Sequence, residues 1–149
     1  MHKAIEQSVL SVENGGGPFG AVIVKNGEII AKAANSVTQT NDPTAHAEVN
    51  AIRLASSKLN TFDLSGCEIY TSCEPCPMCL GAIYWARIDK IYYGNTKQDA
   101  KNIGFDDSFI YDELELPLEK RKIKTTQLER KKAQEAFNNW QLKEDKIEY

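Results

Sequence analysis

Apolar and polar residues along the first third of the chain follow two different periods. Residues 3–13 place Ile5, Val9 and Val12 near one face of a helix, which predicts an amphipathic helix. Residues 20–35 predict two strands joined at Asn26-Gly27, because Asn-Gly is a strong signal for a tight hairpin turn. The chain therefore begins with a helix and a hairpin.

The same patterns continue to the C-terminus. A helix over 44–59 has Thr44 as its candidate N-cap, and a helix over 77–87 has Pro77 in its first turn. Further strands are predicted over 66–72, 90–95 and 121–128, and further helices over 96–105 and 129–143. Strands alternating with helices predict an α/β fold with a central mixed sheet of about five strands and helices on both faces.

Length and charge narrow the class of protein. The chain has 149 residues, a net charge of −3 and a pI of about 5.5, which suits one domain over 1–149. No apolar run is long enough for a membrane span, and the start lacks the apolar region of a signal peptide. An acidic chain does not favour nucleic acid as a partner, and residues 112–149 balance acidic against basic side chains.

The spacing of the cysteines points to a specific chemistry. The four cysteines are Cys67, Cys73, Cys76 and Cys79. Without a secretory signal we expect a reducing compartment, the cytoplasm, where a Cys-x-x-Cys pair indicates metal binding or redox chemistry. Cys67 lies in a predicted strand and is interpreted as a buried apolar residue, and Cys73 receives no role.

A metal needs more donors than the thiol pair. Cys76 and Cys79 are neighbours on the first turn of a helix, where the helix dipole favours thiolates. His46 opens another predicted helix, whereas His2 lies at the N-terminus. One histidine and two cysteines give three zinc ligands with an open fourth position, the arrangement of catalytic zinc. Glu48 is then placed to move a proton at that position.

Each half of this pattern is weak alone. A thioredoxin-like redox site would explain the two cysteines but neither His46 nor Glu48. A purely structural zinc site would not need Glu48 beside an open position. Together, the His-x-Glu and Pro-Cys-x-x-Cys patterns form the signature of zinc-dependent nucleobase deaminases.

The stretches "TAHAEVNAI" and "CEPCPMCLGAI" resemble the cytidine deaminase-like superfamily, and the resemblance covers almost the whole chain. Within it, "GFDDSFIY" and a chain ending in "EY" are most similar to small bacterial guanine deaminases. The resemblance implies a three-layer αβα fold, a zinc site of one ion per chain at His46, Cys76 and Cys79, and Glu48 as the catalytic proton shuttle.

The resemblance also implies residues that bind a purine. Asn35 hydrogen-bonds the base, Asp107 recognises guanine, and Tyr149 closes the site. These relatives are domain-swapped homodimers, so Asp107 and Tyr149 are expected to serve the partner's site. Independently of the resemblance, Phe19 and Trp85 are candidates for stacking on the base, with simple packing as the equal alternative.

Ala47, between His46 and Glu48, is a further candidate for contact with the substrate. Asp106 is expected to cap a turn rather than to meet the substrate. The expected reaction is hydrolytic deamination of guanine to xanthine and ammonia. A tRNA adenosine deaminase is the alternative, and guanosine, pterins and triazines remain open as substrates.

Overall fold

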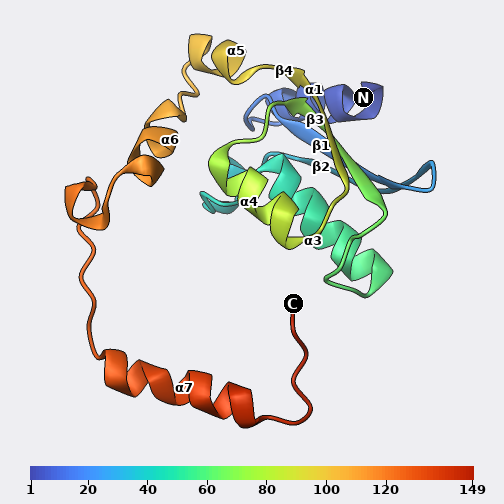
Figure 1. The fold of residues 1–149 in the computed structure, drawn as a ribbon. Helices are drawn as coiled ribbons and strands as arrows, with labels where there is room; N and C mark the ends of the chain where they lie inside the picture. Colours follow the sequence, from blue (N-terminus) through green and yellow to red (C-terminus); the bar gives the residue numbers. More distant parts are fainter. The chain divides into compact units, whose positions relative to one another are not determined.

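A mixed sheet of four strands forms the centre of residues 1–108 in the computed structural model, which describes all residues 1–149 (Figure 1). Its strands are β1 (Gly20–Lys25), β2 (Glu28–Ala34), β3 (Cys67–Cys73) and β4 (Lys90–Asn95). Their order is β2-β1-β3-β4; β1 is antiparallel to both neighbours, and β3 and β4 are parallel. The predicted mixed α/β sheet is confirmed with four strands rather than five.

The helices of this unit follow the predicted order, except for one short helix, α2, which the sequence pattern did not predict. They are α1 (His2–Glu13), α2 (Val37–Thr40), α3 (Ala47–Leu59), α4 (Pro77–Trp85) and α5 (Lys97–Asn102). The β1–β2 hairpin turns at Asn26 and Gly27, with φ of 52° and 80°. Positive φ at both residues is the backbone of the tight turn that Asn-Gly favours. The hairpin prediction is therefore confirmed.

Helices cover both faces of the sheet, as predicted (Figure 1). On one face α3 and α4 pack with β1 and β3 around a core that includes Ala51, Ile23, Ile69 and Ile83. On the other face α1 crosses Gly20 so closely that a side-chain carbon there would lie 2.3 Å from the carbonyl oxygen of Ala4. Only glycine permits this approach. The two central strands, β1 and β3, are thus largely buried, whereas the edge strand β4 stays mostly exposed.

Thr44 is not the N-cap of α3, contrary to the prediction. The helix begins at Ala47 with His46 as its N-cap. The backbone N–H and the hydroxyl of Thr44 both donate to Oδ1 of Asp42, at 2.8 and 2.7 Å. Asp42 thus closes a turn on Thr44, a local bond that competes with helix capping. The correction matters because it places His46 itself at the start of the helix.

Residues 109–149 form the second unit, with α6 (Ser108–Glu115), a 3₁₀ turn (Leu118–Lys120) and α7 (Arg130–Leu142). The strand predicted over 121–128 is wrong. The guanidinium of Arg121 donates to the carbonyls of Leu114 and Leu116, and the N–H of Lys122 donates to Glu113. These bonds fold the segment back onto the end of α6, and no other strand pairs with it.

This second unit has no buried residue of its own. Its exposed apolar side chains include Ile123, Leu128, Phe137, Leu142 and Tyr149. No helix of either unit is long and apolar enough to cross a membrane.

Candidate active site

Two helix N-termini from the same face of the sheet supply the chemistry-bearing side chains. His46 is the N-cap of α3 and Cys76 is the N-cap of α4, both with extended backbone. Glu48 and Cys79 follow in the first turns of these two helices. Pro77 starts α4 without loss, because the first helical N–H has no intrahelical partner. The two helices pack on one core, and this brings segments thirty residues apart to one place.

The three predicted zinc donors lie together. The Nδ1 atom of His46 is 3.5 Å from Sγ of Cys76 and 3.4 Å from Sγ of Cys79. All three ligand atoms lie within 4.8 Å of one another. A tetrahedral zinc ion, with bonds of about 2.0 Å to nitrogen and about 2.3 Å to sulfur, holds such ligands roughly 3.5 Å apart. The donor set and its spacing therefore suit one zinc ion.

The two thiols differ in their proton affinity. Hydrogen bonding from Cys79 lowers the pKa of Cys76 to about 4, with a further contribution from His46. The same hydrogen bond with Cys76, followed by burial, raises the pKa of Cys79. The pKa of His46 is raised by its contact with Cys76. The lowered pKa of Cys76 favours its thiolate, which is the form that binds zinc.

Glu48 reaches this group of donors from α3. Its side chain is 6% exposed, and the Cys79 thiol donates to its Oε2 at 3.4 Å. Burial raises the pKa of Glu48. A buried carboxyl beside a metal site is placed to accept a proton and to return it.

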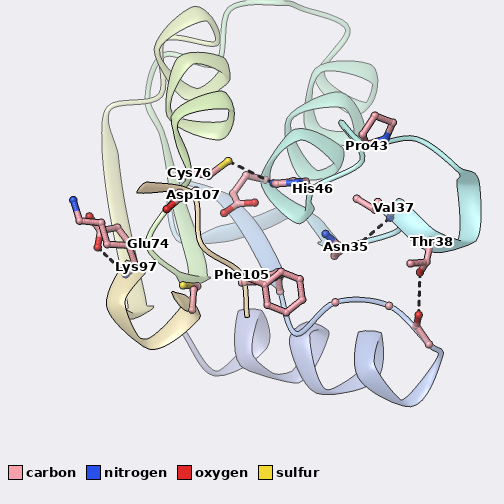
Figure 2. Close-up of a pocket in the computed structure, with 17 residues that line it drawn as sticks. Asn35, Val37, Thr38, Pro43, His46, Glu74, Cys76, Lys97, Phe105 and Asp107 are labelled. Atoms are coloured by element: carbon pink, nitrogen blue, oxygen red, sulfur yellow. Dashed lines mark hydrogen bonds between the residues drawn. The ribbon is translucent and has the colours of Figure 1, made fainter. Parts of the chain in front are cut away.

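His46, Glu48 and Cys76 open into a cavity of about 400 Å³ within residues 1–108, and Cys79 is buried next to them (Figure 2). The cavity is lined by Gly15, Gly16, Gly17, Phe19, Asn35, Val37, Thr38, Pro43, His46, Glu48, Cys73, Glu74, Cys76, Lys97, Ala100, Phe105 and Asp107. The predicted residues Phe19, Asn35 and Asp107 are therefore brought to the same cavity as the zinc donors. The cavity has room for a purine base.

Asn35 is held firmly at the end of β2. Its backbone N–H donates to the carbonyl of Phe19 at 3.0 Å, and its own carbonyl accepts from the Ser11 hydroxyl at 3.1 Å. The side-chain oxygen accepts from the N–H of Val37 at 3.2 Å, so the amide nitrogen is the group left to meet a ligand.

Two neighbouring aspartates after α5 have different surroundings. Asp106 accepts from the N–H and hydroxyl of Ser108 and pairs with Lys101 at 2.9 Å, as expected for a capping residue. Its hydrogen bond from Ser108 lowers its pKa to about 2. Asp107 instead lines the cavity, where burial and then the charge of Cys76 raise its pKa. Asp107 thus faces the cavity of its own chain.

Sequence reasoning missed Phe105, which also lines this cavity. Its ring meets Phe19 edge to face, with centroids 4.9 Å apart at 87°. The signal was available, since Phe105 directly precedes the two aspartates in "GFDDSF". The wall formed by residues 15–17, Val37 and Pro43 was also missed, because loop contacts carry no periodic pattern.

The remaining predicted residues lie elsewhere. Trp85 ends α4, is 69% exposed and is not part of this cavity. The side chain of Ala47 is fully buried in the core between α3 and the sheet. Tyr149 belongs to the second unit and is 71% exposed. Their contact with substrate stays a prediction.

Comparison with known proteins agrees with this geometry. Residues 1–95 match the family described as the cytidine and deoxycytidylate deaminase zinc-binding region. The chain belongs to this family. Its members share the zinc-binding region, and in this chain that region contains His46, Cys76 and Cys79.

Two relatives in this family differ in how much of the chain they resemble. A guanine deaminase of Bacillus subtilis is 54% identical over 134 residues, which are 90% of this chain and 86% of that protein. A tRNA-specific adenosine deaminase of Aquifex aeolicus is 50% identical over 90 residues, 60% of each chain. The X-ray structure of guanine deaminase from Bacillus subtilis has a TM-score of 0.96 at 51% identity and covers 99% of this chain and 95% of its own.

Proposed function

We propose that this protein deaminates guanine hydrolytically to xanthine and ammonia. The observation that carries the proposal is one cavity that joins the zinc donors and Glu48 to the carboxylate of Asp107. The guanine deaminase of Bacillus subtilis supports it, because the similarity extends over nine-tenths of the chain and includes the Asp107 segment. The tRNA deaminase matches only 60% of the chain.

The chemistry divides between the metal and one carboxylate. Zinc, when bound, makes hydroxide available near neutral pH. Glu48 takes the proton released from water and transfers it to N3 of the base as the C2–O bond forms. Glu48 then takes the proton of the new C2 hydroxyl and delivers it to the exocyclic amine, so that the C2–N bond breaks, the C2 carbonyl forms and ammonia is released. Water and guanine thus give xanthine and ammonia, with no other reactant.

Recognition rests on the other residues of the cavity. Guanine presents N1–H and the 2-amino group side by side as two donors, which suits the acceptor Asp107. Adenine presents an acceptor at N1, and so would leave Asp107 without a donor. Sites that hydrogen-bond a substrate group reject analogues that lack it by up to about 10⁴-fold. The amide nitrogen of Asn35 and the rings of Phe19 and Phe105 complete the contacts with the base.

A substrate panel tests the proposal. Ammonia release is measured with guanine, adenine, guanosine, a triazine and adenosine within the tRNA anticodon. We expect the highest kcat/KM with guanine and at least about 10³-fold less with adenine. A preference for tRNA adenosine would replace this proposal with the RNA-editing alternative, which the acidic charge of the chain does not favour.

We also propose that the protein is a cytoplasmic homodimer that exchanges residues 109–149 between chains. The segment has exposed apolar side chains and no buried residue, so it needs another surface to cover it. Four free cysteines suit a reducing compartment. Because Asp107 lines the cavity of its own chain, the exchange would bring Tyr149, rather than Asp107, to the partner's site.

Subunit mixing tests the exchange. A chain with Glu48→Gln and a chain lacking Tyr149 are each expected to lose most activity. If Tyr149 acts on the partner, their heterodimer has one complete site, and the isolated heterodimer should have half the activity of the native dimer. An inactive mixture, once heterodimer formation is shown by mass spectrometry, would refute the exchange.

A further inference from the structure

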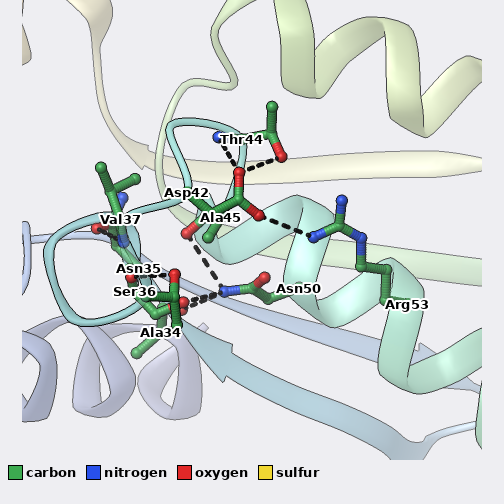
Figure 3. A network of polar contacts seen from close by, with 10 residues as sticks. Ala34, Asn35, Ser36, Val37, Asp42, Thr44, Ala45, Asn50 and Arg53 are labelled. Carbon is green, nitrogen blue, oxygen red and sulfur yellow. Dashed lines mark hydrogen bonds and ion pairs between the residues drawn. The ribbon is translucent and has the colours of Figure 1, made fainter.

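One amide side chain ties together three segments beside the cavity. Asn50 lies on α3, one turn after His46, and its Nδ2 donates to three oxygens. The acceptors are the carbonyl of Ala34 at 3.0 Å, the hydroxyl of Ser36 at 3.1 Å and the carbonyl of Ala45 at 3.3 Å (Figure 3). None of these atoms lines the cavity, so Asn50 has no direct part in the proposed chemistry.

The three acceptors lie next to residues of the candidate site. Ala34 and Ser36 flank Asn35, the residue whose amide nitrogen faces the cavity. Ala45 directly precedes His46. The N–H of Ser36 also donates to the carbonyl of Ala45 at 3.0 Å, so the end of β2 and the start of α3 are joined by the backbone as well. Asn50 therefore fixes the spacing between one metal donor and one substrate contact.

The same side chain closes the loop between those two points. Residues 37–44 leave Ser36 and return at Ala45, and they carry three residues of the cavity wall, Val37, Thr38 and Pro43. The other link from α3 to this loop is the ion pair of Arg53 and Asp42, at 3.7 Å with both side chains substantially exposed. Exposed pairs of this kind contribute little, whereas Asn50 is partly buried and makes three short contacts.

We infer that Asn50 is a positioning residue, which holds Asn35 and the 37–44 loop in register with His46 so that the base is presented to the metal site. The inference rests on the proposed function for the roles of Asn35 and His46. The amide supplies donors to all three partners, and an apolar side chain would remove these bonds and leave the Ala34 carbonyl without the donor from α3. Displacement of reacting groups by about 1 Å can cost roughly 100-fold in rate.

The test compares Asn50→Ala with Arg53→Ala, a matched control on the same helix and the same loop. Below the melting temperature, and normalised to bound zinc, kcat/KM for guanine should fall about 10- to 100-fold in Asn50→Ala. It should change less than about threefold in Arg53→Ala. A residue that only stabilises the fold would leave kcat/KM of the folded, zinc-bound fraction unchanged, and that result would overturn the inference.

Two further readouts separate positioning from general damage. Hydrogen exchange of the Ser36 amide and the 37–44 loop should rise in Asn50→Ala and not in Arg53→Ala. In a double-mutant cycle with Asn35→Ala, the two losses should be less than additive, because Asn50 acts through Asn35. Full additivity, or unchanged exchange at Ser36, would contradict the role.

The activity of Asn35→Ala bears on the proposed function, whereas hydrogen exchange in Asn50→Ala bears on the role of Asn50. If Asn35→Ala alone leaves kcat/KM for guanine unchanged, the proposed role of Asn35 is wrong, while the exchange data still decide whether Asn50 holds the loop. Should Asn50→Ala not fold, Asn50→Ser keeps one donor and is used instead. Wild-type activity and wild-type exchange in Asn50→Ser would overturn the inference.

Discussion

The two ends of the cavity are built in different ways. The chemical end consists of His46, Glu48, Cys76 and Cys79, which occupy the caps and first turns of two helices. The recognition end consists of Phe19, Asn35, Phe105 and Asp107, which come from residues before β1, after β2 and after α5. Regular elements hold the proposed reacting groups, whereas the residues proposed to select the base lie in loops.

Burial follows this division only in part. Cys79 is fully buried and Glu48 is 6% exposed, whereas Phe105 is 46% exposed, but Asn35 at the recognition end is only 7% exposed. This contrast predicts that changes at the chemical end abolish turnover, and that changes at the recognition end mainly alter affinity and selectivity. Side-chain replacements at each end test this prediction.

Replacement of a metal donor should have the largest effect. Cys79→Ala removes one of three ligands, so we expect loss of zinc and no measurable deamination. Cys73→Ala is the matched control, because Cys73 lines the cavity but does not belong to the donor group. It should retain one zinc per chain. Metal analysis of both purified variants decides the assignment, and undiminished zinc in Cys79→Ala would contradict it.

Glu48→Gln should have the second largest effect on turnover. General acid–base steps contribute on the order of 10²–10⁴-fold each, and Glu48 is proposed to make at least two transfers. We expect kcat to fall by at least about 10⁴-fold, with zinc retained and guanine still bound. Single-turnover kinetics and metal analysis give both quantities. A variant with intact zinc and near-native kcat would remove Glu48 from the mechanism.

Asp107→Ala tests the recognition end. Loss of the carboxylate that we propose accepts from the donor edge of guanine should lower kcat/KM by at least about 100-fold, roughly 2.7 kcal/mol, without loss of zinc. Asp106→Ala is the neighbouring control, since that carboxylate caps Ser108 and pairs with Lys101. Its kcat/KM should stay within about threefold of native. Equal losses in the two variants would indicate damage to the segment rather than a lost substrate contact.

Phe105→Ala should have the smallest effect of the four. Stacking of a base on an aromatic ring contributes about 1–3 kcal/mol. The ring of Phe105 also supports Phe19 through their edge-to-face contact. We expect KM for guanine to rise about tenfold with kcat nearly unchanged, as measured by steady-state kinetics. Phe105→Tyr keeps the ring and should remain close to native.

The chemical end could be predicted from the sequence because its residues follow local rules. The Cys-x-x-Cys spacing places both thiols on one helical turn. Elsewhere in the fold, the β1–β2 hairpin was predictable for the same kind of reason, because Asn26-Gly27 favours a tight turn. The prediction of Thr44 as the N-cap of α3 was wrong for a local reason too, because the N–H and hydroxyl of Thr44 donate to Asp42. The strand predicted over 121–128 failed for a different reason, because no strand pairs with it and Arg121 and Lys122 bond to the end of α6 instead.

The recognition end was only partly predictable. Asn35 and Asp107 were identified through resemblance to a known family, and both line the cavity. The places of Phe105 and of residues 37–44 in the cavity wall were not predicted. Contacts between distant segments, such as those of the Asn50 side chain with the carbonyls of Ala34 and Ala45, leave no pattern in the sequence. Trp85 was proposed from its residue type alone, and the structure places it away from the cavity.

The most direct test of the central claim follows the oxygen that replaces the amine. Guanine is incubated with the zinc-loaded protein in ¹⁸O-labelled water, and xanthine and ammonia are quantified by mass spectrometry. Hydrolysis at C2 predicts one labelled oxygen in each xanthine and one ammonia for each guanine consumed, with both products lost in Glu48→Gln. Absence of xanthine with native zinc content, or equal turnover in Glu48→Gln, would contradict the proposed function.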